Sequence, residues 1–130
     1  MSLTVAPELL RRAETADVDD DEFVACVRES LPYAWTVVSD VAGRLSAGGG
    51  PMADHAVPPP GEAERGQLLR ALASDAIRGA LERRFGVRLA FQNCHRVAAF
   101  TPGAAGDAAR AGFTTPRAQL LNQSPELRNC

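Results

Sequence analysis

Two segments of the chain, residues 23–45 and 62–85, repeat apolar side chains at intervals of three and four residues. This spacing gathers the apolar side chains on one face of an α-helix. Pro32 interrupts the first segment, and a proline is comfortable only in the first turn of a helix, so one helix should end just before it and another should begin there. The second segment predicts one long helix, ended by Gly86 in the left-handed conformation.

Residues 87–100 alternate in character, which is typical of β-structure. In a hairpin the opposing residues lie on the same face, so the loop length can be tested against this alternation. A three-residue loop at residues 93–95 pairs Phe91 with Val97 and keeps the apolar side chains on one face. One long bent strand is the alternative. The sequence therefore predicts a mostly helical α+β fold, with three to five helices packed with one β-hairpin at about residues 87–100.

The length of 130 residues is that of one common domain, so we expect a single domain over residues 1–130. Residues 46–61 are dense in Gly and Pro and predict a loop. Residues 101–112 predict a second, flexible loop. Residues 113–130 predict a C-terminal helical tail, in which Pro116 opens one helix and Ser124 caps another.

Composition excludes several classes of function. All 14 basic residues are arginines, and the missing lysine excludes a Schiff-base lysine and a phosphate-loop lysine. The net charge is -2 and the arginines are scattered, whereas nucleic-acid binding needs a clustered basic face, so we do not expect a nucleic-acid partner. No stretch is apolar enough to span or target a membrane, which predicts a cytoplasmic protein without a membrane partner.

Cys94 and His95 are adjacent in the predicted hairpin loop, and they suggest a thiol-dependent enzyme as an alternative function. Cys94 would be the nucleophile and His95 its base, while Arg96 or Arg88 would favour the thiolate. No glycine-flanked nucleophile elbow accompanies the pair, and no Asp or Asn stands at a recognisable spacing to orient the imidazole. An enzyme is therefore not the preferred interpretation.

A metal site is the second chemical alternative. The chain contains four side chains that could together supply tetrahedral zinc ligands: Cys26, Cys94, His95 and Cys130. They lack the paired C-x-x-C spacing of common structural zinc sites. We therefore expect no zinc and no other cofactor.

The preferred interpretation is a small non-enzymatic domain that acts by protein–protein interaction or self-association, in a regulatory or scaffold role. The outer edges of an isolated hairpin leave main-chain groups unpaired and invite pairing with another chain. The even-numbered face of the hairpin mixes polar and apolar side chains, as partner surfaces do. On this face we predict Phe100 as the anchor of a homodimer or of a complex with another protein, with Arg88, Gln92 and Arg96 as directional contacts.

The stretches GQLLRALASDAIRGALERRFGVRLAFQNCHRVAAF and TPRAQLLNQSPELRNC resemble a small family of uncharacterised proteins of filamentous actinobacteria. The use of Arg in place of Lys suits the GC-rich genomes of such organisms. The resemblance covers most of the chain. It implies an actinobacterial, cytoplasmic setting, and it implies no activity, cofactor or catalytic residue.

Overall fold

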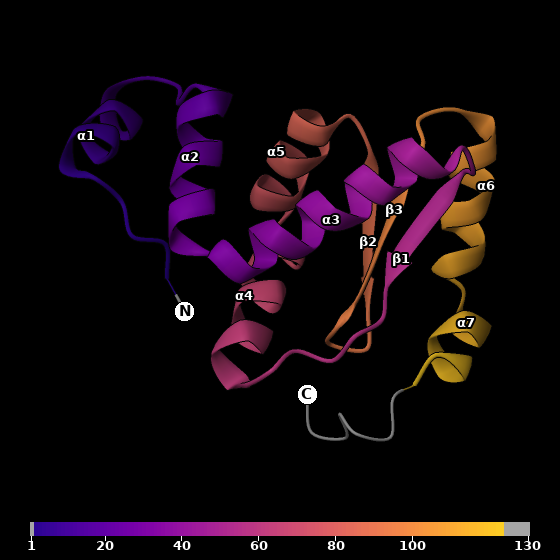
Figure 1. The fold of residues 1–130 in the computed structure, drawn as a ribbon. Coiled ribbons are helices and arrows are strands. Elements are labelled where there is room, and N and C mark those ends of the chain that lie inside the picture. Colours follow the sequence, from indigo (N-terminus) through magenta and orange to yellow (C-terminus); the bar gives the residue numbers. More distant parts are fainter. Residues whose placement is uncertain (1, 124–130) are drawn as a thin grey trace.

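The computed structural model describes residues 2–123, which form seven helices and a three-stranded antiparallel sheet (Figure 1). The predicted class, mostly helical α+β, is confirmed, although the helices outnumber the three to five expected. The elements follow in the order α1 (Pro7–Thr15), α2 (Asp20–Ser30), α3 (Pro32–Gly48), β1 (Met52–His55), α4 (Glu62–Leu72), α5 (Asp75–Phe85), β2 (Arg88–Gln92), β3 (Arg96–Phe100), α6 (Ala104–Phe113) and α7 (Pro116–Leu121). Over this part of the chain, none of the helices combines the length and the apolar character needed to cross a membrane.

The first apolar segment forms two helices, as predicted from Pro32. The helix α2 ends at Ser30, and Pro32 lies in the first turn of α3, where its missing N–H removes no helical hydrogen bond. Leu31 joins the two helices and is 0% exposed. The apolar faces of α2 and α3 thus continue one another into the same core.

The second segment is not one helix, so the prediction of a continuous helix over residues 62–85 is wrong. A short turn separates α4 from α5, and in it the Ser74 Oγ accepts a hydrogen bond from the Ile77 N–H at 3.2 Å. The Arg78 Nη1 donates to the Leu72 carbonyl at 3.0 Å, which satisfies a main-chain group at the end of α4. Each side of the break is therefore capped by a side chain from the same segment.

The hairpin of β2 and β3 has the predicted three-residue loop. Phe91 pairs with Val97 and Gln92 pairs with Arg96. Within the loop, φ is positive at Asn93 (53°) and Cys94 (67°). Two consecutive positive φ values are typical of a type I′ turn, which suits the right-handed twist of paired strands.

A third strand lies within residues 46–61, so the prediction of a loop across that whole segment is wrong. The strand order is β1-β3-β2, which makes β3 the central strand. The strand β1 runs antiparallel to β3, with Met52 opposite Phe100 and His55 opposite Val97. The strand β1 therefore pairs with the edge of β3 that the hairpin alone would leave unpaired.

Helices cover both faces of the sheet. The face that carries Leu89, Val97 and Ala99 packs against α3, α4 and α5 in the main core. The opposite face, which carries Ala98 and Phe100, is covered by α6, and Figure 1 shows α6 on the side of the sheet away from α4 and α5. The helix α6 occupies most of residues 101–112, so the prediction of a flexible loop there is wrong.

In the predicted C-terminal tail, α7 begins at Pro116 as expected. The predicted Ser124 cap lies outside the described residues.

Candidate functional site

Phe100, the predicted anchor for a partner, is inside the protein. Its side chain is 0% exposed and packs edge-on against Phe113 of α6, with the ring centroids 5.7 Å apart. The prediction that Phe100 lies on an exposed face is therefore wrong. The helix α6 supplies, within the same chain, the cover that a partner was expected to supply.

Arg96 and Gln92 belong to an internal polar network. The Arg96 Nη2 lies 2.7 Å from the Asp54 Oδ2, its Nη1 donates to the Asn122 Oδ1, and its guanidinium lies over the Phe113 ring at 5.7 Å. Gln92 is 5% exposed; it donates to the Phe113 carbonyl and accepts from the Asn122 Nδ2 at 3.2 Å. These contacts tie the sheet to α6 and to the end of α7, so both residues are already engaged.

The two outer edges of the sheet are capped by charged side chains. On β1 the Asp54 carbonyl accepts from the Arg44 Nη2 at 2.9 Å, and on β2 the Leu89 N–H donates to the Glu82 Oε2 at 2.8 Å. Arg88, the remaining predicted contact, is half exposed and lies 3.6 Å from the same Glu82 oxygen. Charged side chains at an edge are a common device against strand addition. They weigh against the hairpin edge as the contact surface.

The Cys94 and His95 pair lies in the hairpin turn. His95 is 4% exposed, and its Nδ1 lies 2.7 Å from the Asn93 carbonyl. This contact occupies one ring nitrogen with the loop backbone. A base that serves a neighbouring nucleophile needs its nitrogen directed at that nucleophile.

Three residues of the zinc hypothesis, Cys26, Cys94 and His95, lie in the described part of the chain, and they do not form one group. Cys26 is a buried free thiol on α2, and its Sγ donates to the Thr4 carbonyl at 3.4 Å. Cys130 lies outside the described residues. Within residues 2–123, no three His, Cys, Asp or Glu side chains gather in a way that could hold a metal ion.

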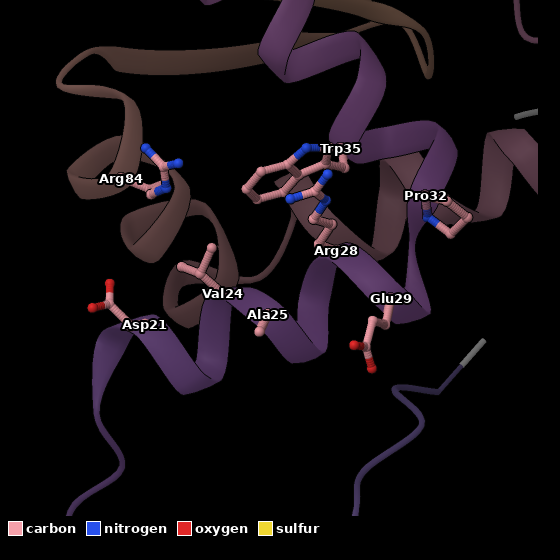
Figure 2. A pocket seen from close by; sticks show the side chains of 8 residues that line it. All are labelled: Asp21, Val24, Ala25, Arg28, Glu29, Pro32, Trp35 and Arg84. Carbon is pink, nitrogen blue, oxygen red and sulfur yellow. The ribbon is translucent and has the colours of Figure 1, made fainter.

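A surface cleft that we did not predict lies where α2, α3 and α5 meet (Figure 2). Its volume is about 560 Å³. The helix α2 contributes most of its lining, α3 contributes Pro32 and Trp35, and α5 contributes one side chain. The lining residues are Asp21, Val24, Ala25, Arg28, Glu29, Pro32, Trp35 and Arg84. We call it the α2–α3–α5 cleft.

A row of aromatic and cationic side chains runs along the α2–α3–α5 cleft, and all of its members except Phe85 line the cleft. The Arg28 guanidinium lies over the Trp35 ring at 5.4 Å, and Trp35 meets Phe85 with ring centroids 5.1 Å apart and an interplanar angle of 53°. Arg84 in turn lies over the Phe85 ring at 5.6 Å. A guanidinium held over a ring keeps N–H groups that can bind other acceptors. Trp35 packs on the core and also lines the cleft.

Four charged residues line the cleft, and none of them forms an ion pair within residues 2–123: Asp21, Arg28, Glu29 and Arg84. Their sequence neighbours do form such pairs. The Arg83 Nε donates to the Asp20 Oδ2 at 2.6 Å, and this hydrogen bond lowers the pKa of Asp20. The cleft thus presents two charges of each sign that have no ion-pair partner in the part of the chain that the structure describes.

Sequence reasoning could find only part of this site. The run of carboxylates before residue 23 is typical of a helix N-terminus, and Asp21 lies in the first turn of α2 as that pattern predicts. The spacing of Asp21, Ala25 and Arg28 places them along one face of α2. Arg84 comes from a helix more than fifty residues later, and no local pattern indicates that it joins them.

A family model named KH_NucS_shadow and described as "NucS shadow ORF" matches residues 1–130. No curated protein and no solved structure matches the chain.

Proposed function

We propose that the chain, which belongs to the family described as NucS shadow ORF, is a non-enzymatic domain of the actinobacterial cytoplasm that contacts another protein through the α2–α3–α5 cleft. The observation that carries the proposal is the group of four charges around the half-buried Trp35, none of which has an ion-pair partner among residues 2–123. Tryptophan and arginine dominate the energetics of many protein–protein contacts, because they combine a large apolar surface with directional hydrogen bonding.

The surface around the β2–β3 hairpin is less suited to a partner than the cleft. Around the hairpin, the polar side chains Gln92 and Arg96 are bonded internally, and charged residues cap a main-chain group on each edge. A partner at the hairpin would have to displace these bonds, and each buried polar group left without its bond would cost free energy. The charged residues that line the cleft form no ion pair within residues 2–123, so a partner that binds there would displace none of that kind.

A chain that is selected for its protein product should combine matched helix breaks, turn residues and a continuous core. Here the hairpin turn, the Ser74 cap and the main hydrophobic core all favour the same fold. Such agreement between levels is typical of foldable sequences and supports a protein product.

Site-specific photo-cross-linking in the source cells would test the proposal. A photoreactive residue in place of Ala25, which lines the cleft, should yield a covalent complex with a protein. The matched control carries the same group in place of Ala108, an exposed alanine of α6, and should yield none. Equal cross-linking from the two positions would contradict the proposal, and so would the absence of peptides of this chain from the cell extract.

We also expect the chain not to bind single-stranded RNA, although the letters KH in the family name are those of an RNA-binding module. That module clamps the nucleotide backbone with a Gly-x-x-Gly loop. The pattern occurs here once, at residues 103–106, where Asp107 adds a negative charge to the first turn of α6 and Gly106 packs on the Thr101 backbone. Gel-shift assays with labelled single-stranded RNA should show no complex at low salt. A complex that is lost on Gly103→Asp would overturn this expectation.

A further inference from the structure

We infer that the protein in the α2–α3–α5 cleft is a second copy of this chain, bound with its α2 antiparallel to the first; this inference rests on the proposed function. A two-fold symmetric contact presents the same patch from both copies, so the patch must complement itself. The cleft meets this condition because the charged residues that line it are two arginines and two carboxylates. A purely acidic segment of another protein would meet the two carboxylates as well as the arginines, so charge complementarity favours the second copy.

The spacing along α2 fits this arrangement. Asp21, Ala25 and Arg28 are four and then three residues apart, so they lie along one face of the helix. Asp21 and Arg28 are seven residues apart, which is about 10 Å along the axis at 1.5 Å per residue. A two-fold axis near Ala25 then sets Asp21 of each copy opposite Arg28 of the other. The small Ala25 side chain at the centre allows the two helices to approach closely.

The other two charges agree with the same orientation. Asp21 and Arg84 also line an adjacent depression between α2 and α5, which places Arg84 beside the N-terminal end of α2. Figure 2 shows Asp21 and Glu29 toward opposite ends of α2, with Val24 and Ala25 between them. Antiparallel packing brings the N-terminal end of one α2 to the C-terminal end of the other. Arg84 of one copy would then face Glu29 of the second copy.

The expected dimer is weak and sensitive to salt. An exposed ion pair contributes little net affinity, so the charges mainly select the register, while Pro32 and Trp35 supply the apolar surface that becomes buried. Salt screens exposed charges, so dissociation should increase with ionic strength. Because Trp35 is the single tryptophan of the chain and lines the cleft, its fluorescence should report association directly.

A charge-swap series, followed by sedimentation and by Trp35 fluorescence over a dilution series, tests the inference. Arg28→Asp and Asp21→Arg should each weaken the dimer by at least about tenfold, since each places like charges opposite one another twice. The double variant Asp21→Arg/Arg28→Asp restores both pairs with exchanged signs and should return the dissociation constant to within about threefold of the unmodified value. Arg117→Asp, an exposed control on α7 without an ion pair in the described part of the chain, should have no effect.

The outcomes separate this inference from the proposed function. A chain that stays monomeric up to about 1 mM overturns the inference. If Ala25 still cross-links to another protein in that case, the proposed function stands, and if it does not, both fail. Single variants that weaken the dimer without rescue in the double variant would overturn the antiparallel register. Circular dichroism will show whether each charge-reversed variant folds. If one does not, Arg28→Gln and the salt dependence of the unmodified dimer serve as the test. A dissociation constant that changes neither with Arg28→Gln nor with salt overturns the inference.

Discussion

Replacing Gly106 by alanine should lower the free energy of unfolding by about 3 kcal/mol or more, at the upper end of what overpacking costs. A Cβ at this position would lie 1.7 Å from the Thr101 carbonyl oxygen and 2.7 Å from the Thr101 carbonyl carbon. These are main-chain atoms at the end of β3, where the Thr101 N–H donates to the Pro51 carbonyl at 3.0 Å. The methyl group can therefore be accommodated only if α6 moves away from the sheet.

Gly112→Ala is the matched control in the same helix, because a Cβ there would meet nothing within 4 Å. Alanine is the better helix former, so this variant should be as stable as the parent or more stable by up to about 1 kcal/mol. Urea unfolding followed by circular dichroism measures both variants. If Gly106→Ala and Gly112→Ala proved equally stable, α6 would not pack against the end of β3 in the way described.

Replacing Leu72 by alanine should cost about 2–5 kcal/mol, the range for a large apolar side chain removed from a well-packed core. Leu72 is 2% exposed and belongs to the main hydrophobic cluster, at the end of α4 that adjoins the break before α5. The lost methyl groups leave a cavity that the surrounding helices cannot fill completely. A loss of this size is a large fraction of the stability of an ordinary domain.

Leu69→Ala removes the same atoms from the same helix and serves as the control. Leu69 is 40% exposed, so its truncation should cost less than about 1 kcal/mol. Denaturant midpoints compared at constant slope give the two free energies. A cost below about half a kcal/mol for Leu72→Ala, or equal costs for the two leucines, would contradict the placement of α4 and of the break that follows it.

The features predicted correctly from the sequence are those in which one residue restricts its own backbone. Pro32 separates α2 from α3, and Gly86 ends α5 with φ at 66°. The register of β2 with β3 also followed, because a three-residue loop keeps the alternating apolar residues on one face.

The break between α4 and α5 was missed for a local reason. Ser74 followed by Asp75 is a helix-start signal, yet the apolar spacing continues on both sides of it and favours a single helix. The local sequence around Ser74 is compatible both with one continuous helix and with a serine that caps a new helix. Tertiary packing distinguishes them, since the break lets both α4 and α5 place apolar residues in the main core.

The strand β1 and the helix α6 could not be read from their own residues. The four residues of β1 are all half-buried and show no alternation, and their partner strand is about forty-five residues away. The helix α6 is rich in Ala and Gly, and its cover of Phe100 depends on the close approach of Gly106 to Thr101. Its position explains why the predicted anchor at Phe100 is buried.

The sequence by itself determined the helical segments around residue 32, the hairpin register and the α+β class, because each depends on residues within a few positions of one another. Only the tertiary structure decided which faces of those elements remain exposed. It covers the hairpin with α6 and β1, and it brings Arg84 of α5 beside Asp21 and Trp35 at the cleft. Burial depends on what the whole chain packs together, and no local spacing carries that information.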